Sequence, residues 1–165
     1  MQPSGPRNPL FLREEELDRS LELLFRVQAI LGRPLHGPLG AAGLGPIDYL
    51  LLFLVRRRPG LTGADLVGLT GLPKQNLSRH LAALDAAGLV ARGVDAADRR
   101  RRPLASTAAA DRLLDDLLGL QKRHLRRVFR KLGPEAVEGF QQVLSELVGP
   151  DGRGAAPASS SGGGA

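Results

Sequence analysis

The sequence predicts a mainly α-helical protein with one small β-hairpin. Between residues 10 and 148, apolar residues recur every three or four positions over most of the chain, which is the period of an amphipathic helix. Glycine and proline interrupt this pattern at positions that suit helix ends. Two short apolar segments, residues 89–95 and 104–107, flank a polar stretch and favour paired strands. Residues 1–9 and 149–165 are rich in proline, glycine or serine, so we expect disordered tails.

The first part of the folded region, residues 10–148, predicts two helices. Leucines 17, 21, 24 and 31 share one face of a first helix over about residues 10–32. Residues 33–46 are rich in glycine and proline, so we expect a loop there, with room for a short turn of helix. Pro46 suits the first position of a second helix, which runs to Arg58 and whose wide apolar face makes it central to the core.

Two short helices joined by a tight turn are expected next. Thr62 can cap the first of them, and Asp65 three residues later completes a capping-box pattern. Gly71 breaks the chain, Pro73 opens the second short helix, and Gly88 ends it. The hairpin follows directly.

Two longer helices complete the prediction, over about residues 107–132 and 135–148. A helix, a tight turn with glycine, a second helix and a hairpin, in this order, predict a winged helix-turn-helix. We place this DNA-binding unit at about residues 46–107 and expect the helices of residues 10–32 and 107–148 to serve dimerisation.

The second short helix has the composition of a recognition helix. Its leucines point to one side, while the opposite face carries small or hydrogen-bonding side chains that allow close approach to a major groove. Arginine can bond guanine, and glutamine or asparagine can bond adenine, so we expect Gln75, Asn76 and Arg79 to contact bases. Contacts to the DNA backbone are expected from Lys74, Ser78 and Thr62. The alternative is an ordinary amphipathic surface helix.

The polar tip of the hairpin concentrates positive charge. It contains Asp98, Arg99, Arg100, Arg101 and Arg102. Narrow minor grooves attract arginine, so this tip predicts a wing that contacts DNA beside the recognition helix. We expect Asp98 to hold one arginine in position, with Arg100 as the first choice. The alternative is a solvated run of charges.

The composition excludes several other classes of protein. The 165 residues carry a net charge of +6, and such a basic surface fits a polyanionic partner. Of the 23 basic residues 20 are arginine, a bias that codon usage in a GC-rich genome would also produce. The absence of cysteine excludes disulfides, cysteine-containing zinc sites and thiol redox sensors. The longest apolar run, residues 47–55, is too short to span a bilayer, so we expect no membrane partner. The composition therefore predicts an intracellular protein with a basic surface.

No catalytic or metal-binding pattern stands out. Three histidines, His36, His80 and His124, lie far apart, and none pairs with a carboxylate or a second histidine at metal-ligand spacing. Nucleotide-binding glycine motifs and nucleophile motifs are missing from the sequence. We therefore expect no enzyme activity, no cofactor and no metal. The basic face over residues 122–131 fits an acidic partner, an anionic ligand or a solvated surface.

The central region resembles the MarR (multiple antibiotic resistance regulator) family of bacterial transcription factors. The resemblance is carried by GLGPIDYLLL (residues 43–52), LTGADLVGLTGLPKQNLSRHLAALDAAGLV (61–90) and RGVDAADRRRR (92–102). In the last segment, Asp98 and Arg100 match the family's wing motif. The chain departs from the family after the second strand, where residues 106–110 replace a Leu-Thr pair and a glycine, and where Pro103 opens the strand.

The resemblance implies a homodimer that binds double-stranded DNA at a pseudo-palindromic operator, as a repressor. It also implies a small-molecule effector, resembling a planar aromatic acid, bound between the dimer helices and the winged domain. The polar and aromatic residues available there are His36, Asp48, Tyr49 and Phe53, for which a core or surface role is the alternative. Independently of the resemblance, the outer helices carry more apolar residues than one small domain can bury.

The alternative function is a helical protein-interaction module whose basic surface docks an acidic partner. Such a module should not distinguish one DNA sequence from another.

Overall fold

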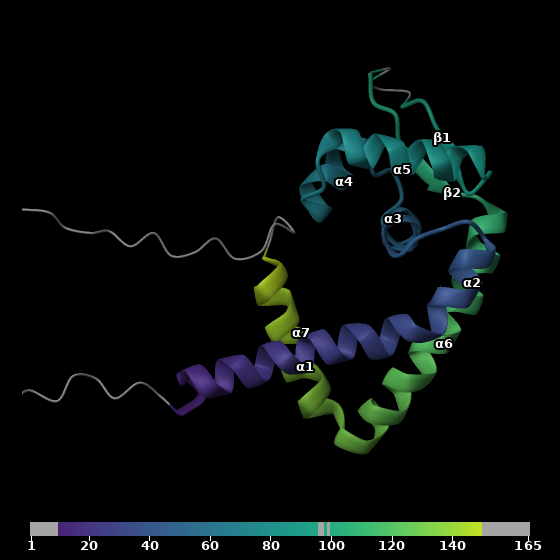
Figure 1. The fold of residues 1–165 in the computed structure, drawn as a ribbon. Helices are drawn as coiled ribbons and strands as arrows, with labels where there is room; N and C mark the ends of the chain where they lie inside the picture. Colours follow the sequence, from purple (N-terminus) through teal and green to yellow (C-terminus); the bar gives the residue numbers. More distant parts are fainter. Residues whose placement is uncertain (1–9, 96–97, 99, 150–165) are drawn as a thin grey trace, which may run out of the picture.

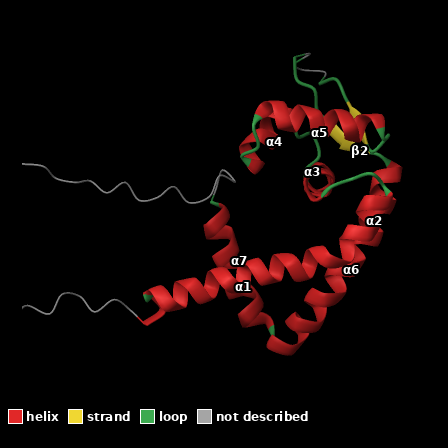
Figure 2. Cartoon of the chain, in the orientation of Figure 1, coloured by secondary structure: helices red, strands yellow, loops and turns green. Residues whose placement is uncertain are grey.

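The computed structural model describes residues 10–95, 98 and 100–149 of the chain. The predicted tails, apart from Gly149, therefore lie outside the described residues, as does Arg99. The described part is mostly helical with one two-stranded antiparallel sheet, as the sequence predicts (Figure 2). A compact head contains α3, α4, α5 and the sheet, and an elongated arm contains α1, the far half of α6 and α7 (Figure 1).

The predicted helices form at nearly the predicted bounds. They are α1 (Glu14–Gly32), α3 (Pro46–Arg57), α4 (Gly63–Thr70), α5 (Lys74–Ala86), α6 (Ala108–Leu132) and α7 (Pro134–Val148). Pro46 is the first residue of α3, where its missing N–H leaves no helical hydrogen bond unmade. Thr107 caps α6 by accepting a hydrogen bond from the Ala110 N–H at 3.2 Å, and its hydroxyl donates to the Gly88 carbonyl at 2.8 Å.

The segment between α1 and α3 corrects the prediction of a loop. It contains a short 3-10 helix, η2 (Arg33–Leu35), and the helix α2 (His36–Ala41). Leu35, Leu39 and Leu44 are buried here, and this burial drives helix formation despite the glycines. Pro38 lies in the first turn of α2, where a backbone N–H has no helical partner to lose.

The hairpin strands are shorter than predicted. Strand β1 (Val90–Arg92) pairs antiparallel with β2 (Leu104–Ser106), with Val90 opposite Ser106 and Arg92 opposite Leu104. The ladder ends where Pro103 has no N–H to donate. The Gly93 N–H still donates to the Pro103 carbonyl at 2.8 Å, which closes the base of the wing.

One hydrophobic core joins the head to the first half of α6. Leu51, Leu66, Leu84 and Leu114 are fully buried, one each from α3, α4, α5 and α6. The arm packs much less tightly: α1 and α7 have no buried residue. An apolar groove of about 210 Å³ lies between α1, α6 and α7 and is lined by residues such as Ile30, Phe129 and Phe140.

Among the described residues, no single helix has the length and apolar character to cross a bilayer. The bent pair formed by residues 14–41 and 46–57, which meet at 95°, satisfies those two criteria only in combination.

Candidate nucleic-acid interface

The helix-turn-helix is fixed by a capping box and a left-handed glycine. The Asp65 N–H donates to the Thr62 hydroxyl oxygen at 3.3 Å, and the Thr62 N–H and hydroxyl both donate to Asp65 Oδ2 at 2.8 Å. These hydrogen bonds from Thr62, together with the charge of Arg101, lower the pKa of the Asp65 carboxyl. Gly71 ends α4 with φ of +67°, a conformation that a side chain would disfavour. The turn therefore sets α4 and α5 at a defined angle.

The recognition helix α5 buries its leucine face and exposes the predicted contact residues. Leu77, Leu81 and Leu84 are buried. The five predicted contact residues of this helix are all exposed: Lys74, Gln75, Asn76, Ser78 and Arg79. Arg79 Nη2 donates to Asn76 Oδ1 across one turn at 3.4 Å, so these two side chains lie side by side. The structure thus gathers the predicted base-contacting residues on one solvent-facing surface.

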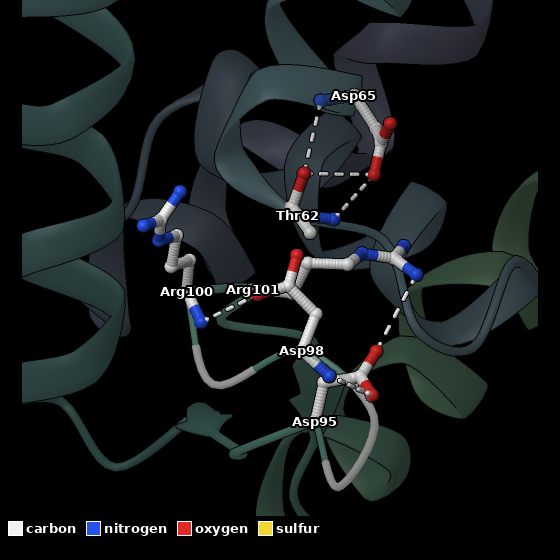
Figure 3. Close-up of polar contacts among 6 residues, drawn as sticks. All are labelled: Thr62, Asp65, Asp95, Asp98, Arg100 and Arg101. Carbon is white, nitrogen blue, oxygen red and sulfur yellow. Dashed lines mark hydrogen bonds and ion pairs between the residues drawn. The ribbon is translucent and has the colours of Figure 1, made fainter.

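The wing loop is organised by two aspartates (Figure 3). Asp98 Oδ1 accepts the backbone N–H of Arg100 at 2.9 Å, and Asp95 Oδ1 accepts the backbone N–H of Asp98 at 3.2 Å. The guanidinium of Arg101 reaches Asp95 Oδ2 at 3.4 Å. Asp98 therefore holds Arg100 in position through the backbone N–H of Arg100 and not through its guanidinium. The Arg100 side chain points away from both carboxylates (Figure 3).

The wing and the start of α4 form one continuous surface. A shallow groove of about 360 Å³ lies between them, lined by residues 62–65 and 100–102. The Leu104 N–H donates to the Leu61 carbonyl at 2.7 Å and so anchors the wing to the segment that leads into α4. A neighbouring groove of about 440 Å³ is lined by Lys74 and Ser78 of α5 and by Arg92 of β1. Thr62, the recognition helix and the wing arginines thus border the same side of the head.

The four residues expected to line an effector pocket point in different directions. Asp48 accepts hydrogen bonds from the Gly45 N–H and from His80 on α5, both at 2.8 Å. Tyr49 donates instead to Gln121 Oε1 of α6 at 2.7 Å, and burial raises its pKa. His36 is exposed on α2, and Phe53 is half-buried against the core. Asp48 and Tyr49 are thus occupied in holding helices together.

The Asp48–His80 contact is a histidine–carboxylate pair without metal-ligand spacing, and it is not predicted from the sequence. The two residues are 32 positions apart, so no motif spacing signals the pair. Within the described residues, no cluster of three or more histidine, cysteine or acidic side chains is arranged to hold a metal ion.

The basic face of α6 lies at the far end of the molecule from the recognition helix (Figure 1). It forms an open groove of about 520 Å³ lined by five cationic side chains: Arg123, Arg126, Arg127, Arg130 and Lys131.

Comparison with known proteins identifies the family to which the chain belongs. The MarR family model matches residues 42–101, which include α3, α4, α5 and β1. The HTH-type transcriptional regulator PetP of Rhodobacter capsulatus is 32% identical over 146 residues, which cover 88% of each chain. The chain belongs to the MarR family. A second relative, an HTH-type transcriptional repressor of Mycobacterium tuberculosis, is 30% identical over 68% of this chain and 92% of its own length.

Solved MarR-type structures share the architecture. CouR from Rhodococcus jostii, bound to p-coumaroyl-CoA, superposes with a TM-score of 0.67 at 25% identity, over 81% of this chain and 94% of that one. A Mycobacterium tuberculosis MarR family protein in complex with p-aminosalicylic acid gives a TM-score of 0.52 at 26% identity, over 78% of this chain and 97% of that one. The resemblance seen in the sequence is confirmed, and this MarR family member is a DNA-binding transcriptional regulator.

Proposed function

We propose that this MarR family regulator is a homodimeric repressor that binds a pseudo-palindromic duplex operator in the bacterial cytoplasm, on the nucleoid. The observation that carries the proposal is the surface shared by α5 and the wing. Two grooves that share Gly63 and Ala64 connect Lys74 and Ser78 of α5 with the exposed arginines of the wing, so one head can contact a major groove and the neighbouring minor groove together.

Each side chain has a distinct role in this proposal. Gln75 and Asn76 bond adenine edges, and Arg79 bonds guanine with both of its terminal nitrogens. Lys74 and Ser78 bind phosphates beside the groove. Thr62 uses its hydroxyl in the cap of α4, so it presents the helix N-terminus, rather than a free hydroxyl, to the backbone.

The wing arginines bind the adjacent minor groove and its phosphates. Arg100 and Arg102 extend from a backbone that the aspartates of the loop hold in place. Arg101 must first leave Asp95, an exposed ion pair of 3.4 Å that costs at most about 1 kcal/mol to break.

A second copy of the chain is the proposed partner of the arm. Leu21, Phe25 and Ile30 of α1 are 50%, 67% and 43% exposed, and Val143 and Leu147 of α7 are 59% and 53% exposed. Apolar rows of this size on two helices support a protein partner. A two-fold dimer would place the two heads on successive turns of DNA, about 10 bp apart.

A small-molecule effector is also proposed. Two relatives of known structure hold small molecules, p-coumaroyl-CoA in one and p-aminosalicylic acid in the other. Both contain an aromatic ring, and this supports an aromatic acid or its thioester as the effector class of the present chain.

The test is binding of the purified protein to its own upstream DNA, measured by fluorescence anisotropy against a scrambled duplex at about 150 mM salt. We expect the native sequence to bind more tightly and to resist the scrambled competitor. Equal, salt-sensitive binding to both duplexes would contradict a sequence-specific regulator. Binding to an acidic protein without any DNA preference would support the interaction module instead.

A further inference from the structure

Asp48 is a buried carboxylate at the start of α3, and both of its oxygens are engaged. Its side chain is only 11% exposed. Oδ2 accepts the Gly45 N–H at 2.8 Å, and Oδ1 lies 2.8 Å from Nδ1 of His80. An ionised carboxylate only accepts hydrogen bonds, so Nδ1 is the donor in this pair. Both contacts of this buried side chain are therefore made, which satisfies its hydrogen-bonding groups.

His80 places this contact at a decisive point of the recognition helix. It lies three residues after Leu77 and four before Leu84, at the edge of the buried face. It also follows Asn76 by one helical turn and adjoins Arg79 in the sequence. In the described part of the chain, the Asp48–His80 pair is the side-chain hydrogen bond that joins α3 to α5.

A directional contact is needed here because leucine packing does not fix the rotation of a helix sharply. Apolar contacts are non-directional, and three leucines on one face tolerate a small roll of α5. A roll of about 10° moves atoms at the surface of a helix of this width by about 1 Å. That shift is about twice the 0.5 Å tolerance within which a binding constellation must be held.

We propose that Asp48 is a positioning residue for DNA recognition: through His80 it sets the rotation of α5 and hence the direction of Asn76 and Arg79. Asp48 itself lies in the interior of the head and touches no DNA. The proposal deepens the function proposed above and rests on the role of α5 in contacting bases.

A double-mutant cycle tests this proposal. The variants are Asp48→Ala, His80→Ala and the double substitution, and the readout is the ratio of Kd values for the operator and for single-base variants of it. If Asp48 acts through His80, each single variant should lose selectivity on the order of tenfold, a loss that lies within the range of coupling energies between residues in contact. The double variant should lose no more than either single variant. The His80→Phe variant keeps an aromatic ring at position 80 and leaves the hydrogen bond from the Gly45 N–H to Asp48 in place. It therefore removes only the Asp48–His80 contact, in a protein whose α3 is intact.

Asp115→Ala is the matched control. Asp115 pairs with Arg56 of α3 at 2.7 Å, so this variant also removes a carboxylate partner of α3, but it leaves α5 untouched. We expect the control to lower the melting temperature slightly and to leave selectivity unchanged. A fall in melting temperature without a change in selectivity for Asp48→Ala would overturn the proposal. Additive losses in the cycle would also overturn it, because they would assign His80 a DNA contact of its own.

Amide NMR shifts of the free protein separate this proposal from the proposed function. The Asp48→Ala substitution should shift the amide signals of α5 around Asn76 and Arg79 in the absence of DNA. Unchanged α5 signals would refute the positioning role even if the operator assays succeed. A wild-type protein that fails to distinguish operator sequences, together with shifted α5 signals, would refute the base-contacting role and leave the positioning of α5 supported.

Discussion

Replacing Arg100 by alanine tests the wing in the way that depends most directly on the structure. The Arg100 backbone is held by Asp98, and its side chain extends away from the carboxylates of the loop (Figure 3). The substitution therefore removes a cation without breaking an internal ion pair in the described wing. Any loss of affinity can be assigned to the missing contact with DNA.

The expected magnitude follows from charge counting. Each phosphate contact contributes about −0.9 to the slope of log K against log salt for duplex DNA. The proposed homodimer would carry two copies of Arg100, so the Arg100→Ala slope should be shallower by about 1.8. The affinity should fall by about 1–3 kcal/mol per lost contact, as for other arginine contacts to DNA. Arg101→Ala should cost less, because Arg101 gives up its contact with Asp95 in order to bind.

The assay is fluorescence anisotropy of an operator duplex over a series of salt concentrations, and Arg130→Ala serves as the control. Arg130 lies on the basic face of α6, at the far end from α5, and its loss changes the net charge equally. We expect the control to retain the wild-type slope. A slope change of the same size in both variants would show that only net charge matters. An affinity loss of a few tenths of a kcal/mol for Arg100→Ala would show that the wing is solvated in the complex.

Four further predictions concern specificity and stability. Arg79→Ala should relax sequence choice, because a bidentate contact to guanine is lost; equal selectivity across a set of operator variants would contradict this. Leu114→Ala should lower the free energy of unfolding by about 2–5 kcal/mol, since Leu114 is fully buried in the core, and denaturant titration measures this loss. Asp65→Asn should cost about 1 kcal/mol at neutral pH. Because the pKa of Asp65 is lowered in the folded state, its contribution is present above the unfolded pKa and is lost as the pH falls through the folded pKa. Melting curves of wild type and variant should therefore converge in acid, and a pH-independent difference would refute the assignment. The pKa of Tyr49 is raised by burial, so its contribution is full below the ordinary pKa of about 10 and is lost as the pH rises through the folded value. Tyr49→Phe should remove that alkaline loss, and an unchanged alkaline melting profile would count against it.

The helices were predictable because each is amphipathic and has clear end signals. Pro46 begins α3 and Thr62 caps α4 where the sequence predicts. The helix α2 was not predictable, because its glycines and Pro38 favour a loop and only burial of Leu35 and Leu39 in the core outweighs that preference. Periodicity describes one segment at a time, and it does not register contacts made by distant parts of the chain.

Local periodicity predicts the exposed residues of α5 but not the contacts that Asp48 and Tyr49 make with other helices. Exposure of Gln75, Asn76 and Arg79 follows from the periodicity of one helix, and the structure agrees. The partners of Asp48 and Tyr49 depend on how α3 packs against α5 and α6, which no local pattern encodes. A buried acidic residue in an otherwise apolar helix was the available signal, since such a residue requires a hydrogen-bonding partner from elsewhere in the fold.

Hydrogen bonds hold the base of the wing and the recognition helix α5 at a fixed separation. The base of the wing is tied to the entry of α4 through Leu104 and Leu61, and the end of β2 is tied to the end of α5 through Thr107 and Gly88. If α5 contacts bases and the wing contacts a minor groove, as proposed, the distance along the operator between these two contacts should therefore be constant. An operator with one base pair inserted between those two contacts should lose one of them entirely, whereas substitutions that preserve this spacing should weaken binding only gradually.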